Sequence, residues 1–318
     1  MYEKNCCTPK HEGKASFNES IDFQIKKTPI NTDKMIFINQ EVFFMGTDYE
    51  FSFTSDGEGP IRKVEIDNFY IDQFPVTNKD FDKFCTATGY KTEAEKFGWS
   101  FVFFQLVPEK TKENITESVS NTPWWWKVNE AYWRQPYGPD SNIKDLENHP
   151  VVHISWNDAN MYAKWIGKQL PSEAEWEMSA RGGLEKKKFS WGEDDKDIYK
   201  KCNIWDGKFP EKNTLKDGWL GTSPVDYFRP NNFDIYDTPG NVWEWCEDWF
   251  SSSFHQIERK KTRVNPIGPE YGSTKTMKGG SYLCHNSYCN RYRTSARTQN
   301  TPDSSTGNLG FRLVYRNK

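Results

Sequence analysis

The pattern of apolar and polar positions predicts short strands in several parts of the chain. The run "MIFINQEVFFMG" (35–46) has apolar residues at alternate positions on either side of a polar break, which predicts strands interrupted by a turn. The run 63–77 alternates apolar and polar residues, as a half-buried strand does. Residues 149–156, "HPVVHISW", predict a buried strand.

Three segments have the apolar spacing and the capping residues of helices. "TNKDFDKFCTATG" begins with Thr77, a residue type that caps helices, and places two phenylalanines three positions apart. "NDANMYAKWIGK" (157–168) gathers its apolar residues on one face. The clearest helix start is "LPSEAEWEMSAR", where Glu175 follows Ser172 by three residues in the capping-box arrangement.

Aromatic residues dominate 94–150, which we expect to be a loop region. Trp124–Trp126 are consecutive, and three consecutive rings cannot all face one core from a regular element. Their rings either pack beneath the loop or form an aromatic rim on a binding surface, and both interpretations stay open. From Trp191 onward, Gly, Asn, Asp and Pro separate strands of only a few residues.

Composition predicts one soluble, loop-rich domain. The chain has 318 residues, of which 35% are hydrophobic and 27% charged, and its 14 Trp can build a core from large flat side chains. Residues 1–33 are polar and rich in Lys, Asn and Thr, so we expect a flexible tail there and a single domain over 34–318.

Charge and hydropathy exclude several partners. The formal net charge is −3 and every basic run is short, so nucleic-acid binding is not expected. No stretch approaches the ~20 apolar residues of a membrane helix, so no membrane association is expected. The N-terminus "MYEKNCCTPKHEGK" lacks the apolar segment of a signal peptide, which predicts a cytoplasmic protein.

One pair of cysteines is a candidate for chemistry. Cys284 and Cys289 enclose four residues in "CHNSYC", among seven cysteines that are too sparse to predict a disulfide framework. Zinc would need a second pair of ligands and a disulfide is disfavoured in a reducing compartment, whereas two thiolates suit Cu(I). The spacing alone does not decide among the three. Arg291, Arg293 and Arg297 follow closely, and nearby positive charge favours thiolates.

Five stretches together resemble the formylglycine-generating enzymes, also called sulfatase-modifying factors. They are "FFMGT", "LPSEAEWEMSARGG", "FSWG", "YDTPGNVWEWCEDWF" and "MKGGSYLCHNSYCNRYRTSARTQNTPDSSTGNLGFR". The resemblance extends from about Met35 to Val314. The stretches "LPSEAEWE" and "GNVWEW" belong to a wider superfamily, whereas the two cysteines of the last stretch are specific to the generating enzymes.

The resemblance implies an α+β fold: a single loop-rich domain, distantly like C-type lectins, with little regular secondary structure. It implies that O2 oxidises one cysteine, in a C-x-P-x-R segment of an unfolded or nascent sulfatase, to Cα-formylglycine. The implied cofactor is Cu(I), held by Cys284 and Cys289, with an external thiol as reductant. We expect the protein to be a monomer.

The same resemblance adds further site residues. Ser281 and Asn308 are implied to line the catalytic pocket with the two cysteines, and Trp243 either lines an oxygen pocket or packs in the core. Arg297 and Arg312 are expected to hold the fold through ion pairs. Family members also carry two structural Ca2+ ions, which oxygen donors on loops suit. One ion would use the side chains of Asn203 and Asp217 with the carbonyls of Ile204 and Trp219, and the other would use Asp237 and Glu244 with the carbonyls of Gly240 and Val242.

Two alternatives remain beside copper-dependent oxidation. One is a superfamily member without copper, such as an iron-dependent sulfoxide synthase, although the chain lacks a His-rich metal site. The other is a lectin-like binding module without catalysis, which the retention of both cysteines argues against. Members resident in the endoplasmic reticulum carry structural cysteines where this chain has Ala163, Ala180, Thr294 and Leu313, and this departure fits a reducing cytoplasm.

The tail contains a short stretch that resembles the substrate pattern itself. In "CTPKH" (7–11), His11 stands where C-x-P-x-R has arginine. The match is either a coincidence in a disordered tail or a tethered pseudosubstrate. In the second case we expect weak self-binding that strengthens on acidification, because a protonated His11 would mimic arginine better.

Overall fold

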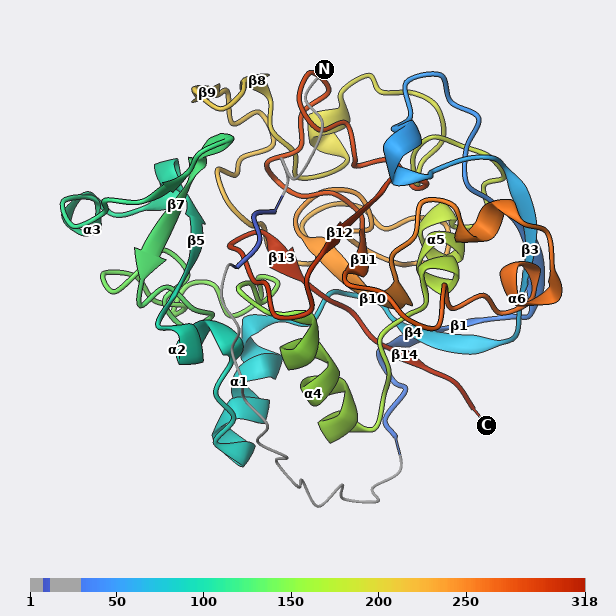
Figure 1. The fold of residues 1–318 in the computed structure, drawn as a ribbon, viewed down its shortest axis with the longest axis horizontal. Helices are drawn as coiled ribbons and strands as arrows, with labels where there is room; N and C mark the ends of the chain where they lie inside the picture. The colour runs from blue at the N-terminus through green and yellow to red at the C-terminus, as the bar shows by residue number, and fades with distance from the viewer. Residues whose placement is uncertain (1–7, 12–29, 318) are drawn as a thin grey trace.

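Short strands joined by long loops make up most of the protein. A computed structural model describes residues 8–11 and 30–317. Figure 1 shows helices and strands mixed in one loop-rich domain, as the sequence predicts. Within the described ranges, no helix is long and apolar enough to cross a membrane.

A four-stranded sheet carries the candidate site, with its strands in the order β12–β11–β10–β13. Strand β10 (Trp243–Trp249) is antiparallel to β11 (Lys275–Lys278) and parallel to β13 (Leu309–Gly310). Strand β12 (Arg297–Asn300) pairs antiparallel with β11. Both cysteines of "CHNSYC" therefore lie in the connection between two neighbouring strands of this sheet.

In the described residues, four smaller sheets surround the central one. They are β1 (Met35–Ile38) with β4 (Phe69–Asp72) and β14 (Val314–Tyr315); β2 (Glu41–Met45) with β3 (Arg62–Ile66); β5 (Trp99–Phe103) with β7 (Thr122–Asn129) and β6 (Ser118–Val119); and β8 (Gly207–Lys208) with β9 (Lys212–Asn213). Strand β14, near the C-terminus, pairs with β4 and so completes the sheet that also contains β1.

The described helices are short, and α1 and α5 begin at the predicted caps, whereas α4 begins after Ser155, which was not predicted. They are α1 (Asn78–Thr88), α2 (Glu93–Phe97), α3 (Glu109–Lys112), α4 (Trp156–Ile166), α5 (Glu173–Arg181) and α6 (Lys260–Arg263). The Thr77 side chain accepts the backbone N–H of Asp80 at the start of α1. At α5, Ser172 Oγ accepts the Glu175 N–H over 3.1 Å and Glu175 Oε2 accepts the Ser172 N–H over 2.7 Å. The predicted capping box is confirmed.

The triple tryptophan differs from the prediction, because it lies in a strand and not in a loop. Trp124–Trp126 belong to β7, which pairs with β5 on one edge and with β6 on the other. Successive side chains of a strand point to opposite faces, so Trp125 is fully buried while its two neighbours remain partly exposed. A strand therefore accommodates three consecutive rings by using both of its faces.

Two predicted strands also differ from the structure. The run 63–77 forms two strands, β3 and β4, because the chain leaves the extended conformation at Asp67–Asn68. The run 149–156 is buried as predicted but forms no strand; His153 has a φ of 59°, which interrupts the extended backbone. The buried segment instead bonds to its surroundings, for example through Ile154, whose carbonyl accepts the indole N–H of Trp245 over 2.9 Å.

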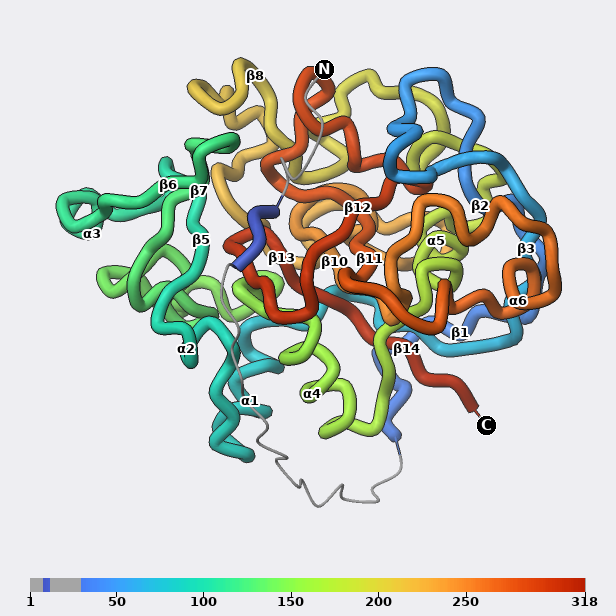
Figure 2. Tube along the Cα trace, in the orientation of Figure 1, coloured from blue at the N-terminus to red at the C-terminus, as the bar shows by residue number. Residues whose placement is uncertain are grey.

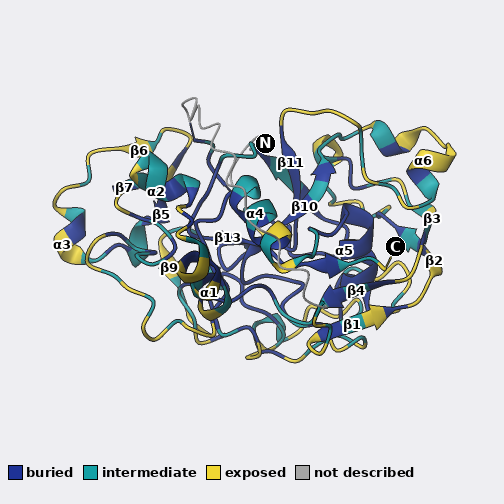
Figure 3. Cartoon of the chain, turned by 90° about the horizontal axis from the view of Figure 1, so that it is seen from below, coloured by how far each residue is buried: buried dark blue, intermediate teal, exposed yellow. Residues whose placement is uncertain are grey.

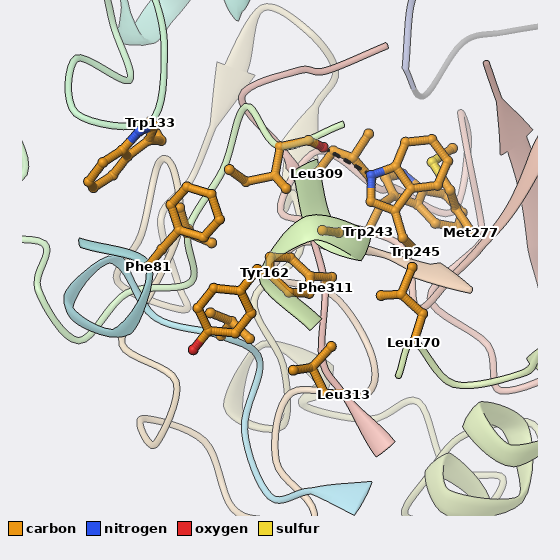
Figure 4. Close-up of a cluster of buried hydrophobic side chains, with 14 of the residues drawn as sticks. Phe81, Trp133, Tyr162, Leu170, Trp243, Trp245, Met277, Leu309, Phe311 and Leu313 are labelled. Carbon is orange, nitrogen blue, oxygen red and sulfur yellow. Dashed lines mark hydrogen bonds between the residues drawn. The ribbon is translucent and has the colours of Figure 1, made fainter. Parts of the chain in front are cut away.

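Aromatic side chains fill the main core, between α1, α4 and the central sheet (Figure 4). The rings of Phe81 and Tyr162 stack with their centroids 5.7 Å apart. Trp243 of β10 is fully buried in the same cluster, which also includes Cys284 and Cys289. The paired cysteines therefore border the core of the domain.

Buried ion pairs hold the polar helix α5 and the end of the chain in place. Every residue of α5 is buried, and Figure 3 shows the helix in the colour of buried residues. Arg297 Nη2 lies 2.6 Å from a carboxylate oxygen of Glu173, at the start of α5. Arg312 Nε lies 2.6 Å from Glu244 Oε2. The predicted ion-pair roles of Arg297 and Arg312 are confirmed.

Candidate active site

The structure brings Cys284 and Cys289 together as a buried pair of thiols that form no disulfide with each other. Each is about 1% exposed, and their sulfur atoms lie 2.8 Å apart. The pairing follows from a tight turn, because the backbone N–H groups of Tyr288 and Cys289 both donate to the carbonyl of His285. This turn directs both thiols to one point although four residues separate them in the sequence.

Ser281 and Asn308 lie directly beside the first thiol. The Ser281 backbone N–H donates to Cys284 Sγ over 3.4 Å, and the Asn308 amide Nδ2 donates to Ser281 Oγ over 2.9 Å. Thr306 Oγ1 donates to Asn308 Oδ1 over 2.7 Å, which fixes the orientation of the amide. The polar residues predicted for the pocket therefore form a linked set next to Cys284.

Close backbone contact explains the glycines before this set. Gly280 has a φ of 74°, and a Cβ built there would lie 2.9 Å from the Arg291 carbonyl oxygen. A larger residue would therefore be strained and would also push apart the segments that flank the two cysteines.

Trp243 is connected to the site in two ways: its backbone bonds to Asn308, and its ring belongs to the core cluster that includes both cysteines. Its N–H donates to the Asn308 carbonyl over 2.9 Å, so β10 and the Asn308 segment are held together. Its indole N–H has no hydrogen-bond partner among the described residues. Core packing is evident from this burial, and a role of Trp243 in lining an oxygen pocket stays a prediction.

The arginines after the cysteines do not supply free positive charge. Each donates to a carboxylate over 2.6 to 2.7 Å, and the pairs are Arg291 with Asp56, Arg293 with Glu58, and Arg297 with Glu173. Their effect on the thiols is therefore weaker than the sequence alone indicates.

Tyr292 is a neighbour of the thiols that the sequence analysis did not single out. Burial raises the pKa of its hydroxyl, and the nearby thiols Cys202, Cys284 and Cys289 raise it further. The ring is stacked 5.9 Å from Phe189. Tyr292 therefore presents a neutral phenol at the edge of the thiol pair, three residues beyond the second cysteine.

The donor types of the thiol pair fit a soft metal ion such as Cu(I). Among the described residues, no cluster of three or more His, Cys, Asp or Glu side chains offers a different metal centre. The two sulfur atoms lie 2.8 Å apart. This distance is shorter than the combined length of two metal–sulfur bonds of about 2.3 Å each. The thiols of Cys284 and Cys289 would therefore have to move apart to hold an ion between them. The turn that carries them lies at a partly exposed loop, which gives them room to do so.

Three residues of the first predicted calcium set, Ile204, Asp217 and Trp219, meet in the structure, and calcium binding there stays a prediction. Asp217 accepts the backbone N–H groups of Ile204 and Trp219 over 3.2 and 3.0 Å, so the two loops meet at this carboxylate. Burial raises the pKa of Asp217 to about 6. Asn203 Oδ1 is buried without a hydrogen-bond partner in the described part of the chain. A buried carboxylate beside an unsatisfied amide oxygen fits a hard cation.

The second predicted set fits less well. Asp237 is buried, and burial raises its pKa to about 8. Both Glu244 oxygens, however, accept bonds from the Arg312 guanidinium over 2.6 and 2.7 Å, and Oε2 also accepts the Trp176 indole N–H over 2.7 Å. A cation bound by Glu244 would share this carboxylate with a positive charge. Gly240 of the second set packs against Asn203 of the first set. A Cβ at Gly240 would lie 2.2 Å from the Asn203 carbonyl oxygen.

A buried pair of thiols, supported by a serine and an asparagine in a loop-rich α/β domain, indicates a site for thiol chemistry or for a soft metal ion. The family model described as "Sulfatase-modifying factor enzyme 1-like domain" matches residues 22–317, and the chain belongs to this family.

Related proteins are similar in sequence over most of the chain. A protein of Thermomonospora curvata named formylglycine-generating enzyme is 50% identical over 93% of this chain and 98% of its own. A protein of Mus musculus with the same name is 52% identical over 90% of this chain and 76% of its own. A Bos taurus relative named "Inactive C-alpha-formylglycine-generating enzyme 2" is 44% identical over 86% of this chain and 84% of its own. Family membership alone therefore leaves activity to be argued from the site.

The fold is also similar to that of a solved structure. PvdO from Pseudomonas aeruginosa has a TM-score of 0.65 over 89% of this chain and 94% of its own, at 23% sequence identity. At this identity the likeness shows the fold alone.

Proposed function

We propose that the protein is an active formylglycine-generating enzyme, which converts one cysteine in a C-x-P-x-R segment of an unfolded or nascent sulfatase to Cα-formylglycine. The observation that carries the proposal is the buried pair Cys284 and Cys289, with sulfur atoms 2.8 Å apart. Relatives named formylglycine-generating enzyme support the substrate and the product.

Cu(I) is the proposed cofactor, and Cys284 and Cys289 would hold it. When bound, it would supply the oxidising chemistry with O2 that two thiols alone do not possess. The substrate cysteine loses two electrons and its sulfur leaves as sulfide, and O2 takes up four electrons. An external thiol therefore has to supply the remaining two electrons and is oxidised to a disulfide.

The chain's own residues position and shield this chemistry. The Ser281 N–H points at Cys284 Sγ and stabilises the thiolate form, because a hydrogen bond to the charged form lowers the cost of burying it. Asn308 holds the Ser281 hydroxyl in one orientation. Burial of both cysteines keeps bulk water from the thiols, as reactive sites commonly do.

The test is conversion of a C-x-P-x-R peptide by the copper-loaded protein with O2 and a thiol reductant. Mass spectrometry should detect the loss that follows from exchanging S for O and removing two hydrogens. Cys284→Ser and Cys289→Ser should each abolish conversion while leaving the melting temperature near that of the wild type. Cys85→Ser is the matched control, because Cys85 is a buried thiol on α1.

Full turnover by either Ser variant would disprove the thiol-pair assignment. No turnover by the wild type, together with tight peptide binding, would instead place the protein with the inactive relatives.

A further inference from the structure

Four residues of the N-terminal segment pack against the domain, close to the candidate active site. Thr8 and His11 are 3% and 6% exposed, although the sequence predicts a flexible tail over 1–33. Tail residues 1–7 and 12–29 lie outside the described part of the chain, whereas 30–33 are described. In Figure 2 the segment 8–11 is the short dark-blue tube that lies near β5 and β13.

Side chains at the end of β12 and in the loop after it bind the backbone of this segment. Asn300 Nδ2 donates to the Pro9 carbonyl over 3.0 Å. The His11 N–H donates to Ser304 Oγ over 2.9 Å. The domain thus binds this segment through its backbone, a common way for a protein to bind a peptide.

The His11 ring occupies an aromatic pocket formed by α2 and β5. It stacks on Trp99 with ring centroids 4.2 Å apart and an interplanar angle of 7°, and it meets the edge of Phe101 at 5.3 Å. Nε2 lies 3.2 Å from the Ser305 carbonyl oxygen, so Nε2–H donates there. Nδ1 is buried without a hydrogen-bond partner among the described residues. The pocket therefore selects a flat side chain that donates one hydrogen bond.

The surface that binds the tail segment (the groove) is linked along the chain to the catalytic set. Ser304 and Ser305, which bind the tail segment, are followed within three residues by Asn308, the residue that donates to Ser281 beside Cys284. The Gly307 N–H donates to the Phe101 carbonyl over 3.0 Å, which ties this loop to β5, the opposite wall of the groove.

We propose that this groove is a peptide-binding surface of the active site and that Thr8–His11 occupy it in cis, so that the chain's own N-terminal segment competes with the peptide substrate. The identity of that substrate rests on the proposed function, whereas the occupancy of the groove does not. Pro9 and His11 stand in the order and spacing of the Pro and Arg of C-x-P-x-R.

A tethered segment needs little intrinsic affinity to compete. A short flexible link gives an effective concentration of about 1 mM. If the segment docks with an intrinsic dissociation constant of about 0.1 mM, about one groove in ten is open, and the apparent affinity for an added peptide falls about tenfold.

The test measures binding, not turnover. A fluorescein-labelled peptide containing S-T-P-K-R, with serine in place of the reactive cysteine, is titrated against the full-length wild type, His11→Ala and Lys10→Ala without copper. His11→Ala should bind the peptide about three- to tenfold more tightly than the wild type, because it loses the stacking on Trp99. Lys10→Ala should match the wild type, since Lys10 is the partly exposed residue of the four.

Equal dissociation constants for the wild type and His11→Ala would overturn the proposal, and so would an equal gain in Lys10→Ala. No saturable binding to any of the three proteins would also overturn it. A gain in His11→Ala without any turnover of a C-x-P-x-R peptide would leave the proposal standing and reject the proposed function. Turnover of the peptide without tighter binding by His11→Ala would support the proposed function and overturn the proposal of this subsection.

Discussion

Asn308 donates a hydrogen bond to Ser281 over 2.9 Å, and this contact ties the segment that leads into β13 to the turn that carries Cys284. Both side chains are buried, so the bond is shielded from water. It connects the loop that binds the N-terminal segment with the thiol pair. A change at either residue should therefore affect both the chemistry and the stability of the protein.

Ser281→Ala should lower kcat about ten- to a hundredfold, the range found for residues that orient a metal ligand. It should also cost about 1–3 kcal/mol of stability, because it removes the buried hydrogen bond between Asn308 and Ser281. Peptide turnover and thermal melting measure the two effects. Ser179→Ala is the matched control, since Ser179 is fully buried and its hydroxyl has no hydrogen-bond partner in the described chain. A kcat within twofold of the wild type would remove Ser281 from the site.

Calcium should stabilise the fold through the Asn203 and Asp217 set. A ligand that binds only the native state, at a hundred times its dissociation constant, adds about 2.7 kcal/mol. We expect Ca2+ to raise the melting temperature of chelator-stripped protein by several degrees, and Asp217→Asn to lose this response. Asp226→Asn, an exposed carboxylate on a nearby loop, should keep it. Identical melting curves with and without Ca2+ would remove the site.

The pair Arg312 and Glu244 should be a major contributor to stability. Both side chains are fully buried, with their charged atoms 2.6 Å apart. Arg312→Met should destabilise the fold by about 3–5 kcal/mol, because it leaves the Glu244 carboxylate buried without its partner. Chemical denaturation measures the loss. If Ca2+ reverses it, Glu244 is a calcium ligand as well; if Ca2+ has no effect, Glu244 acts through the ion pair alone.

Local signals in the sequence predicted the elements that are determined locally. Thr77 and Ser172 begin helices because a cap needs only residues three positions away. The triple tryptophan was misassigned, because its strand depends on β5 and β6, which the local pattern does not reveal. The run 149–156 failed for a similar reason, since a positive φ at His153 is set by tertiary contacts.

The candidate site was predicted by resemblance and not by spacing. Four residues between two cysteines fit several chemistries, and only the turn at His285 brings the thiols together. The bond from Asn308 to Ser281 joins positions that no local pattern connects. The groove for the tail segment was visible only as the weak match in "CTPKH", because Trp99, Asn300 and Ser304 come from distant parts of the chain.

Acidification should release the N-terminal segment, contrary to the expectation from the sequence. Burial lowers the pKa of His11 from 6.5 to about 4 in the docked segment. The hydrogen bond to the Ser305 carbonyl and the charge of Asp303 raise this pKa, whereas Lys127 lowers it. Burial has the largest effect, because a protonated ring would place a second N–H where Nδ1 has no acceptor among the described residues.

The sign of the pH effect follows from these two pKa values. Below about pH 6.5 the His11 ring of the undocked segment takes up a proton, whereas the docked ring stays neutral down to about pH 4. Docking is therefore strongest above pH 6.5 and weakens as the pH falls. Between pH 7.5 and 5.5 docking should weaken about tenfold. The advantage of His11→Ala over the wild type in binding the labelled peptide should therefore shrink towards one at pH 5.5. His11→Ala measured at both pH values provides the control, because it reports how the groove itself responds to acid. If the advantage grew at pH 5.5, the docked ring would be charged, and His11 would mimic arginine as the sequence alone suggested.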